Sequence, residues 1–146
     1  MVRPATLEDL ETLVEGNLRM ALETEDLALD PEVLRAGVRA VLSGAQPGEY
    51  FVLEEEGRIV AQLMITYEWS DWRNGTVWWI QSVYVPPEAR GRGAYRTLYH
   101  EVLERARTAG AKGVRLYVDE RNTAAQEVYT KLGMDGGHYR VFEHML

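Results

Sequence analysis

The chain has 146 residues, 46% of them hydrophobic and 27% charged, with a formal net charge of -7 and no cysteine. This composition is typical of one soluble globular domain and excludes disulfides, thiolate metal sites and a cysteine nucleophile. It also argues against non-specific nucleic-acid binding, which needs a broad basic surface, and against a membrane span, since no apolar run approaches about 20 residues. The N-terminus lacks the apolar core of a signal peptide, so we expect a cytoplasmic protein.

Two helices are predicted at the start of the chain. The first runs from Leu7 to about Leu22, with Thr6 as its cap and Asp9 in its first turn. The second begins at Asp30-Pro31, an N-cap followed by proline at the first helical position, and continues to about Leu42.

Three strands should follow. Tyr50–Glu55 is the first, and the alternating segment Ile59–Trp69 is the second. Asn74-Gly75 is a turn signal that leads into the third, Thr76–Val85, which is apolar nearly throughout and therefore expected at the centre of the sheet.

The second half alternates helices and strands. We predict a helix from about Gly93 to Ala109, a strand at Val114–Asp119, a short helix at Thr123–Leu132 and a last strand at His138–Met145. A helix separates the strand that ends at Val85 from the strand that begins at Val114, so these two should be parallel. The whole chain, residues 1–146, is expected to be one mixed α/β domain.

The segment Arg90-Gly91-Arg92-Gly93 lies between a predicted strand and a predicted helix. Glycine lets the backbone approach a ligand closely, the helix N-terminus offers free N–H groups, and the arginines add positive charge. These features predict a phosphate or pyrophosphate site. A Walker loop would need Gly-Lys-Ser/Thr, and a dinucleotide fingerprint would need a third glycine, and neither is present. The remaining candidate is the coenzyme A loop, Arg/Gln-x-x-Gly-x-Gly/Ala.

Three segments in order support that candidate: IQSVYVPPEARGRG, LYHEVLERARTAGAKGVRLYV and VDERNTAAQEVYTKLGM. Together they resemble the core of the GNAT superfamily of N-acetyltransferases, over about Trp78 to Met134. Met134 stands where the family pattern has Phe. The resemblance implies the GNAT fold: a mixed, mostly antiparallel sheet with a splayed parallel pair of strands and about four helices.

The resemblance also implies acetyl-CoA as co-substrate and assigns the residues that bind it. The backbone at Val83 and Val85 would pair with pantetheine, and an N–H near Val83 would polarise the thioester carbonyl. The other implied cofactor-binding residues are Arg90, Gly91, Arg92, Gly93, Ala94, Tyr95, Asn122, Ala125 and Tyr129. Tyr95 departs from the family, which usually has a small residue there, so its ring must turn away from the pyrophosphate.

Tyr129 occupies the family position of the general acid that protonates the leaving thiolate, although packing alone could also explain it. For the general base we favour Glu68, because a carboxylate beside Trp69 and Trp72 could have a raised pKa. Glu23 and Glu25 are rivals, since the break between the first two helices borders the acceptor site in the family. Water is a further alternative.

The expected acceptor is a primary amine of a small molecule or peptide, bound by Glu25, Trp69, Trp72 and Gln81 through carboxylate and cation–π contacts. The expected reaction is direct attack on acetyl-CoA in a ternary complex, with no metal. Two alternatives stay open: another acyl-CoA as donor, and a non-catalytic CoA-binding sensor or interaction module on the same fold. Homodimer formation, common in such folds, also stays open.

Overall fold

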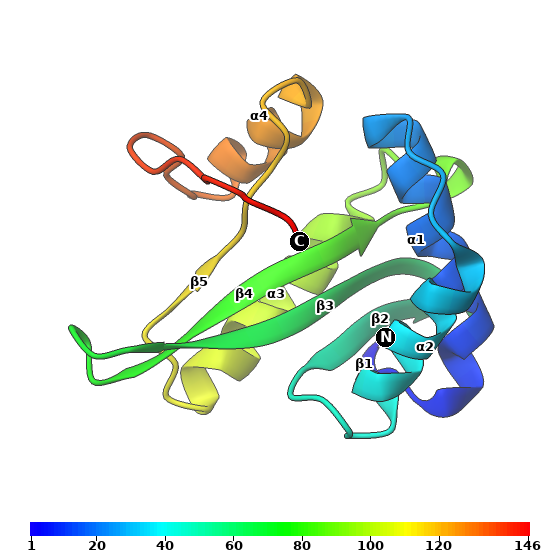
Figure 1. The fold of residues 1–146 in the computed structure, drawn as a ribbon, viewed down its shortest axis with the longest axis horizontal. Coiled ribbons are helices and arrows are strands. Elements are labelled where there is room, and N and C mark those ends of the chain that lie inside the picture. Colours follow the sequence, from blue (N-terminus) through cyan, green and yellow to red (C-terminus); the bar gives the residue numbers. More distant parts are fainter. The chain divides into compact units, whose positions relative to one another are not determined.

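The computed structural model describes residues 1–146 (Figure 1). It divides into two compact units, Met1–Arg115 and Leu116–Leu146, and each is described by itself. The first contains the sheet and three helices, and the second contains one helix.

The first unit is built on one five-stranded sheet with the order β1-β2-β3-β4-β5. Neighbouring strands from β1 to β4 are antiparallel, and β4 and β5 are parallel, as the predicted crossover requires. The strands are β1 (Val2–Pro4), β2 (Glu49–Glu55), β3 (Arg58–Ser70), β4 (Gly75–Tyr84) and β5 (Gly113–Arg115).

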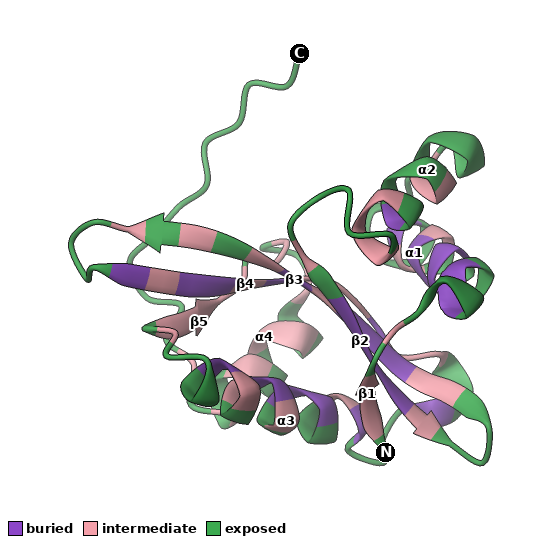
Figure 2. Cartoon of the chain, turned by 90° about the horizontal axis from the view of Figure 1, so that it is seen from below, coloured by how far each residue is buried: buried purple, intermediate pink, exposed green.

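Helices cover both faces of this sheet (Figure 2). On one face, α1 (Leu10–Glu25) and α2 (Pro31–Leu42) form a core with β2, made of Leu10, Leu13, Val14, Val38, Tyr50 and Val52. On the other lies α3 (Ala94–Thr108), whose Arg105 guanidinium carbon is 5.3 Å from the ring centroid of Phe51. Alternate side chains of β2 therefore pack against opposite layers, as strand geometry dictates.

Most predicted elements are confirmed, with four differences. A 3-10 turn at Leu7–Asp9 precedes α1, and β1 was not anticipated because it is very short. The predicted strand Val114–Asp119 is reduced to Gly113–Arg115. The predicted last strand, His138–Met145, is wrong: this segment forms no ladder with any strand. Alternating apolar residues show that a segment could form a strand, but a strand also needs a hydrogen-bonded neighbour.

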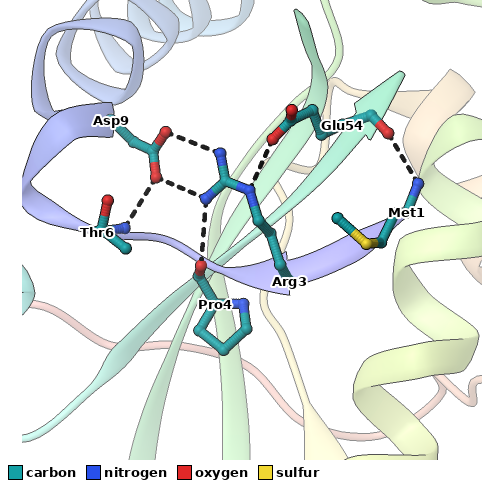
Figure 3. Close-up of polar contacts among 6 residues, drawn as sticks. All are labelled: Met1, Arg3, Pro4, Thr6, Asp9 and Glu54. Atoms are coloured by element: carbon teal, nitrogen blue, oxygen red, sulfur yellow. Dashed lines mark hydrogen bonds and ion pairs between the residues drawn. The ribbon is translucent and has the colours of Figure 1, made fainter. Parts of the chain in front are cut away.

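A polar cluster fixes β1 beside α1 and β2 (Figure 3). The guanidinium of Arg3 donates two hydrogen bonds to Asp9, at 2.8 and 3.0 Å, and one to Glu54 at 2.7 Å. Asp9 also accepts from the backbone N–H of Thr6 at 2.8 Å. Asp9 is buried, and the pairing with Arg3 lowers the pKa of its carboxyl. The cluster thus stabilises the fold only while Asp9 is ionised.

Replacing Asp9 by asparagine is expected to destabilise the first unit by about 1.5–3 kcal/mol at pH 7, the usual contribution of hydrogen bonds to a charged group. Because the folded-state pKa lies below the unfolded one, the contribution is complete above about pH 4 and disappears as the pH falls through the lowered value. Urea unfolding at pH 7 and at pH 3 should therefore show a smaller difference between variant and wild type at the lower pH. The exposed pair Glu15–Arg19 provides the control, and Glu15→Gln should have little effect at either pH.

Gly16 lies in α1 where that helix crosses β3. A Cβ at this position would overlap the side-chain amide of Gln62. Gln62 is buried and donates to the backbone carbonyl of Leu13 at 3.2 Å, so it cannot move without losing that bond. Glycine is therefore required here by the close approach of a buried side chain.

Gly16→Ala should destabilise the protein by about 1–2 kcal/mol, because the cost of displacing a bonded, buried amide exceeds the gain in helix propensity. Gly37 of α2 is the matched control, since a Cβ there meets nothing within 4 Å. Gly37→Ala should stabilise the protein by about 0.5–1 kcal/mol. Chemical unfolding of both variants tests the pair, and stabilisation by both substitutions would contradict the packing argument.

The second unit contains α4 (Thr123–Lys131) and the segment that leads into it. Asn122 caps this helix by accepting from the backbone N–H of Ala125 at 3.2 Å. Gln126 donates to the backbone carbonyls of Asp119 and Glu120 at 3.2 and 3.0 Å, which fixes the chain before the cap. No helix in either unit has the length and apolar character needed to cross a membrane.

Candidate functional site

The predicted phosphate loop joins β4 to α3. After β4 the chain makes a 3-10 turn at Pro87–Ala89, which Ala89 anchors because it has no exposed surface. Gly91 and Gly93 follow with φ angles of +77° and +76°. This left-handed conformation favours glycine, so the backbone explains the spacing of the two glycines.

The loop also has room for a ligand. A Cβ added at Gly91 or Gly93 would meet no atom within 4 Å. Gly93 is the N-cap of α3, and its carbonyl accepts from the N–H of Thr97 at 3.0 Å, which leaves the first-turn amides of the helix directed at the loop. Open backbone, free amides and the helix dipole fit a phosphate group, so the residues present suit the pyrophosphate of coenzyme A.

Tyr95 turns along the helix. Its ring contacts that of Tyr99 one turn further on, with centroids 6.0 Å apart and planes tilted by 40°. A ring held against Tyr99 explains how α3 can begin with a large residue beside a glycine loop.

The end of β4 departs from regular strand geometry in two ways. Ser82 has a φ of +53°, and the register with β3 shifts so that Met64 pairs with Gln81 but Gln62 pairs with Tyr84. Val83 therefore lies in a β-bulge. In addition, the parallel ladder with β5 ends at Trp79–Arg115, so the last part of β4 continues without that neighbour. The main-chain groups of β4 beyond Trp79 are therefore not paired with β5.

Buried polar groups lie beside the bulge. Tyr50 of β2 accepts a hydrogen bond from Asn17 of α1 at 3.2 Å and interacts with the side chain of Ser82. Burial raises the pKa of the Tyr50 hydroxyl, which keeps it protonated and able to donate. These contacts connect α1, β2 and the bulge of β4, so they help to hold the backbone at Val83.

Arg90 has a different environment from Arg92. Its guanidinium donates to the carbonyl of Val85 at 2.9 Å and to the carboxylate of Glu23 at 2.6 Å, and its carbon lies 5.7 Å from the ring centroid of Tyr84. Arg92 has only a long contact of 3.9 Å with Glu55, and its side chain is 58% exposed. Arg92 is therefore the more available cation for an anionic ligand.

Glu23 lies at the end of α1 beside β4. Its carboxylate accepts from the buried hydroxyl of Tyr84 at 3.0 Å as well as from Arg90. The Arg90 guanidinium lowers the pKa of Glu23, so this carboxylate is ionised at neutral pH and is a weak base.

Glu68 lies at the other end of the sheet. It pairs in register with Val77 of β4 and accepts from the guanidinium of Arg115 at 2.6 Å rather than packing between indole rings. Val83 is six residues further along β4, about 20 Å at the usual rise per residue. A general base must reach the proton it removes, so this position does not support Glu68 as the base for an amine at Val83.

The predicted acceptor residues are also spread along the sheet. Trp69 and Trp72 are 65% and 89% exposed near the β3–β4 turn, and Trp69 pairs with Thr76. Gln81 lies five residues beyond Thr76, about 17 Å along the strand, and donates to the hydroxyl of Thr66 at 2.5 Å. Glu25 is the last residue of α1. The tryptophans therefore do not line one amine site together with Gln81.

Asn122, Ala125 and Tyr129 belong to the second unit. Asn122 and Ala125 form the capped first turn of α4, and Tyr129 follows in its last turn. The structure confirms the predicted helix, with Asn122 as its N-cap and Ala125 and Tyr129 within it, and the roles of these residues toward the cofactor remain predictions.

Two features of the site were missed in the sequence: the Tyr84 and Arg90 contacts of Glu23, and the polar group formed by Asn17, Tyr50 and Ser82. No local pattern indicates either one. The position of Glu68 in the sheet, in contrast, could have been predicted from the sequence. The turn at Asn74-Gly75 makes β3 and β4 antiparallel, so the end of β3 must lie beside the start of β4, away from the glycine loop.

Comparison with known proteins agrees with this geometry. The model of the acetyltransferase (GNAT) family matches residues 14–134, which include most of α1, strands β2 to β5, the glycine loop and α4. An uncharacterized N-acetyltransferase of Mycobacterium bovis is 32% identical over 123 residues, which cover 79% of this chain and 76% of the relative. A mycothiol acetyltransferase of Thermobispora bispora is 34% identical over 93 residues, but the chain spans only 30% of that relative.

Solved structures show the same fold. A possible acetyltransferase from Clostridium difficile 630 superposes with a TM-score of 0.91 at 39% identity, covering 100% of this chain and 97% of the other. A predicted acetyltransferase from Clostridium acetobutylicum, crystallised with acetyl-CoA, superposes with a TM-score of 0.81 at 18% identity, covering 99% and 95% of the two chains. At that identity the second match shows the fold alone.

Proposed function

The chain belongs to the acetyltransferase (GNAT) family, and we propose that it transfers an acetyl group from acetyl-CoA to a primary amine of a small molecule or peptide. The observation that carries the proposal is the loop from Arg90 to Gly93, with both glycines in the left-handed conformation and open space where their side chains would be. Such a loop at a helix N-terminus suits a pyrophosphate.

Each part of the loop region has a distinct role in this proposal. The amides of Gly91, Gly93 and the first turn of α3 bind the pyrophosphate, with Arg92 as the nearby cation. The end of β4, which continues beyond its ladder with β5, offers main-chain groups at Val83 and Val85 to the pantetheine arm. The family pattern assigns further cofactor contacts to Asn122 and Ala125.

Acetyl-CoA supplies an activated acetyl thioester when bound. The amine attacks its carbonyl directly, since the chain has no cysteine to carry the acetyl group. An N–H of the bulge at Val83 stabilises the developing oxyanion, and the bulge is held in place by the buried contacts of Tyr50. Tyr129 donates a proton to the leaving sulfur.

The proton of the attacking amine leaves by way of water in this proposal. Glu68 of β3 pairs with Val77, six residues before Val83, and the ion pair with Arg90 makes Glu23 a weak base. Gln81 and Glu25 are the predicted acceptor contacts that remain compatible with an amine near Val83, and the net charge of -7 suits a cationic acceptor.

Thermal unfolding with and without a ligand tests the cofactor site. A ligand that binds the native state raises the midpoint, so acetyl-CoA and CoA at millimolar concentration should raise it and NADH should not. Absence of a shift with CoA would reject the coenzyme A site. A shift with NADH of equal size would indicate a general nucleotide site instead.

Catalysis needs a second experiment, because a non-catalytic CoA-binding module would give the same thermal shift. CoA release should be followed with a panel of polyamines, amino acids and peptide amines, with acetyl-CoA and then propionyl- and succinyl-CoA as donors. Amine-dependent release identifies an acyltransferase and its preferred donor. Binding of CoA without release for any amine in the panel would favour the module.

A further inference from the structure

The strongest unexplained feature of the first unit is the group formed by Glu23, Tyr84 and Arg90. It joins residues from three different places: the end of α1, the end of β4 and the start of the glycine loop. Glu23 and Arg90 are 67 positions apart in the sequence. The conformations of the loop glycines do not explain this convergence, so it requires its own explanation.

The contacts of Arg90 fix the position of its guanidinium, so this residue does more than supply positive charge. Its Nε and Nη2 atoms are already engaged by the Val85 carbonyl and the Glu23 carboxylate, and its plane lies near the ring of Tyr84. Because the guanidinium is a rigid planar fork, two such bonds fix its orientation. The first residue of the loop is therefore held by its side chain.

Tyr84 makes the arrangement more than a surface ion pair. It is only 6% exposed, and its hydroxyl donates to Glu23 at 3.0 Å while also interacting with Arg19. Burial and the Glu23 charge both raise the pKa of Tyr84, so the phenol stays a donor. A buried phenol that loses its acceptor leaves a polar group unsatisfied, which couples the position of Glu23 to the packing of β4.

We propose that Glu23, Tyr84 and Arg90 form a clamp that couples the glycine loop to the end of α1, so that binding of CoA orders the segment between α1 and α2. The inference rests on the proposed function, because the loop must bind CoA for the coupling to operate. Glu23 is then a positioning residue, which acts through Arg90, and not the base.

Two explanations of Glu23 predict opposite effects of Glu23→Gln on CoA affinity. If Glu23 is only a negative charge near an anionic ligand, its removal should tighten binding. If it holds Arg90 and the loop, its removal should weaken binding about three- to fivefold, the effect of losing one partly exposed ion pair. The control is Glu11→Gln, which removes another α1 carboxylate that accepts two bonds from an arginine, here Arg35, and should leave CoA affinity unchanged.

The test combines calorimetric titration of CoA with hydrogen exchange. In the wild type, CoA should slow amide exchange in residues 21–30, and in Glu23→Gln it should not. The loss of affinity should also vanish when Arg90 is already Gln, because a residue that acts through Arg90 has no effect without it. Unchanged or tighter binding by Glu23→Gln, protection equal to the wild type, or a loss that persists in the Arg90→Gln background would each overturn the clamp.

These outcomes are distinct from failure of the proposed function. If the wild type itself does not bind CoA, the coenzyme A site is rejected and the clamp with it. If wild type and Glu23→Gln bind CoA equally, only the clamp is rejected. The thermal midpoints of both variants without ligand show whether a change in affinity reflects unfolding.

Discussion

Replacing Gly93 by alanine will weaken CoA binding about ten- to a hundredfold, the loss expected from one or two hydrogen bonds to a charged phosphate. Gly93 has a φ of +76°, and a Cβ there meets no protein atom within 4 Å. The added methyl group would occupy space that the proposal assigns to the ligand. The left-handed backbone also costs alanine about 1 kcal/mol, which would shift the loop toward another conformation.

A substitution at Gly110 distinguishes the loss of ligand space from the cost of the left-handed backbone. It has a φ of +78° just after α3, and a Cβ there also meets nothing within 4 Å. Gly110→Ala should therefore reduce stability about as much as Gly93→Ala and leave CoA binding intact. Unfolding midpoints measure the shared cost, and calorimetric titration measures affinity. Equal CoA affinity in the two variants would show that the glycine loop does not bind the pyrophosphate.

The sequence alone predicts the structure correctly where the residues that determine it are neighbours in the chain. Asp30 caps α2 by accepting from the N–H groups of Glu32 and Val33, and the helix has the predicted bounds Pro31–Leu42. Asn74 has a φ of +47° and closes the four-residue turn between Ser70 of β3 and Gly75 of β4, because asparagine tolerates the left-handed conformation. The glycine loop was predictable for the same reason, because the backbone conformation restricts the residue type at single positions.

Features that depend on register or on distant contacts were not predictable. The bulge at Ser82 is visible only once β3 and β4 are paired, and the contacts of Glu23 join elements that the sequence separates widely. The environment expected for Glu68 differs in the structure: its partner is Arg115, and its place on β3 is remote from Val83. Residue type suggested a base, but only the strand pairing could show what the carboxylate reaches.

Tyr129→Phe is expected to lower turnover about a hundredfold or more while leaving acetyl-CoA affinity nearly unchanged, as for loss of a general acid. The substitution removes one hydroxyl and keeps the ring, so packing around α4 should persist. Turnover is measured as CoA release with the best amine of the panel, and affinity by calorimetric titration. Tyr139→Phe removes a hydroxyl from the same unit outside the matched pattern and should leave both quantities unchanged.

A lower turnover with unchanged affinity would identify Tyr129 as the general acid. If the phenol protonates the leaving sulfur, its effect is confined to the transition state and must appear in kcat. A ligand contact would instead raise the dissociation constant and leave kcat intact. Equal turnover in Tyr129→Phe and wild type would mean that water protonates the sulfur, and α4 would then serve only to bind the cofactor through Asn122 and Ala125.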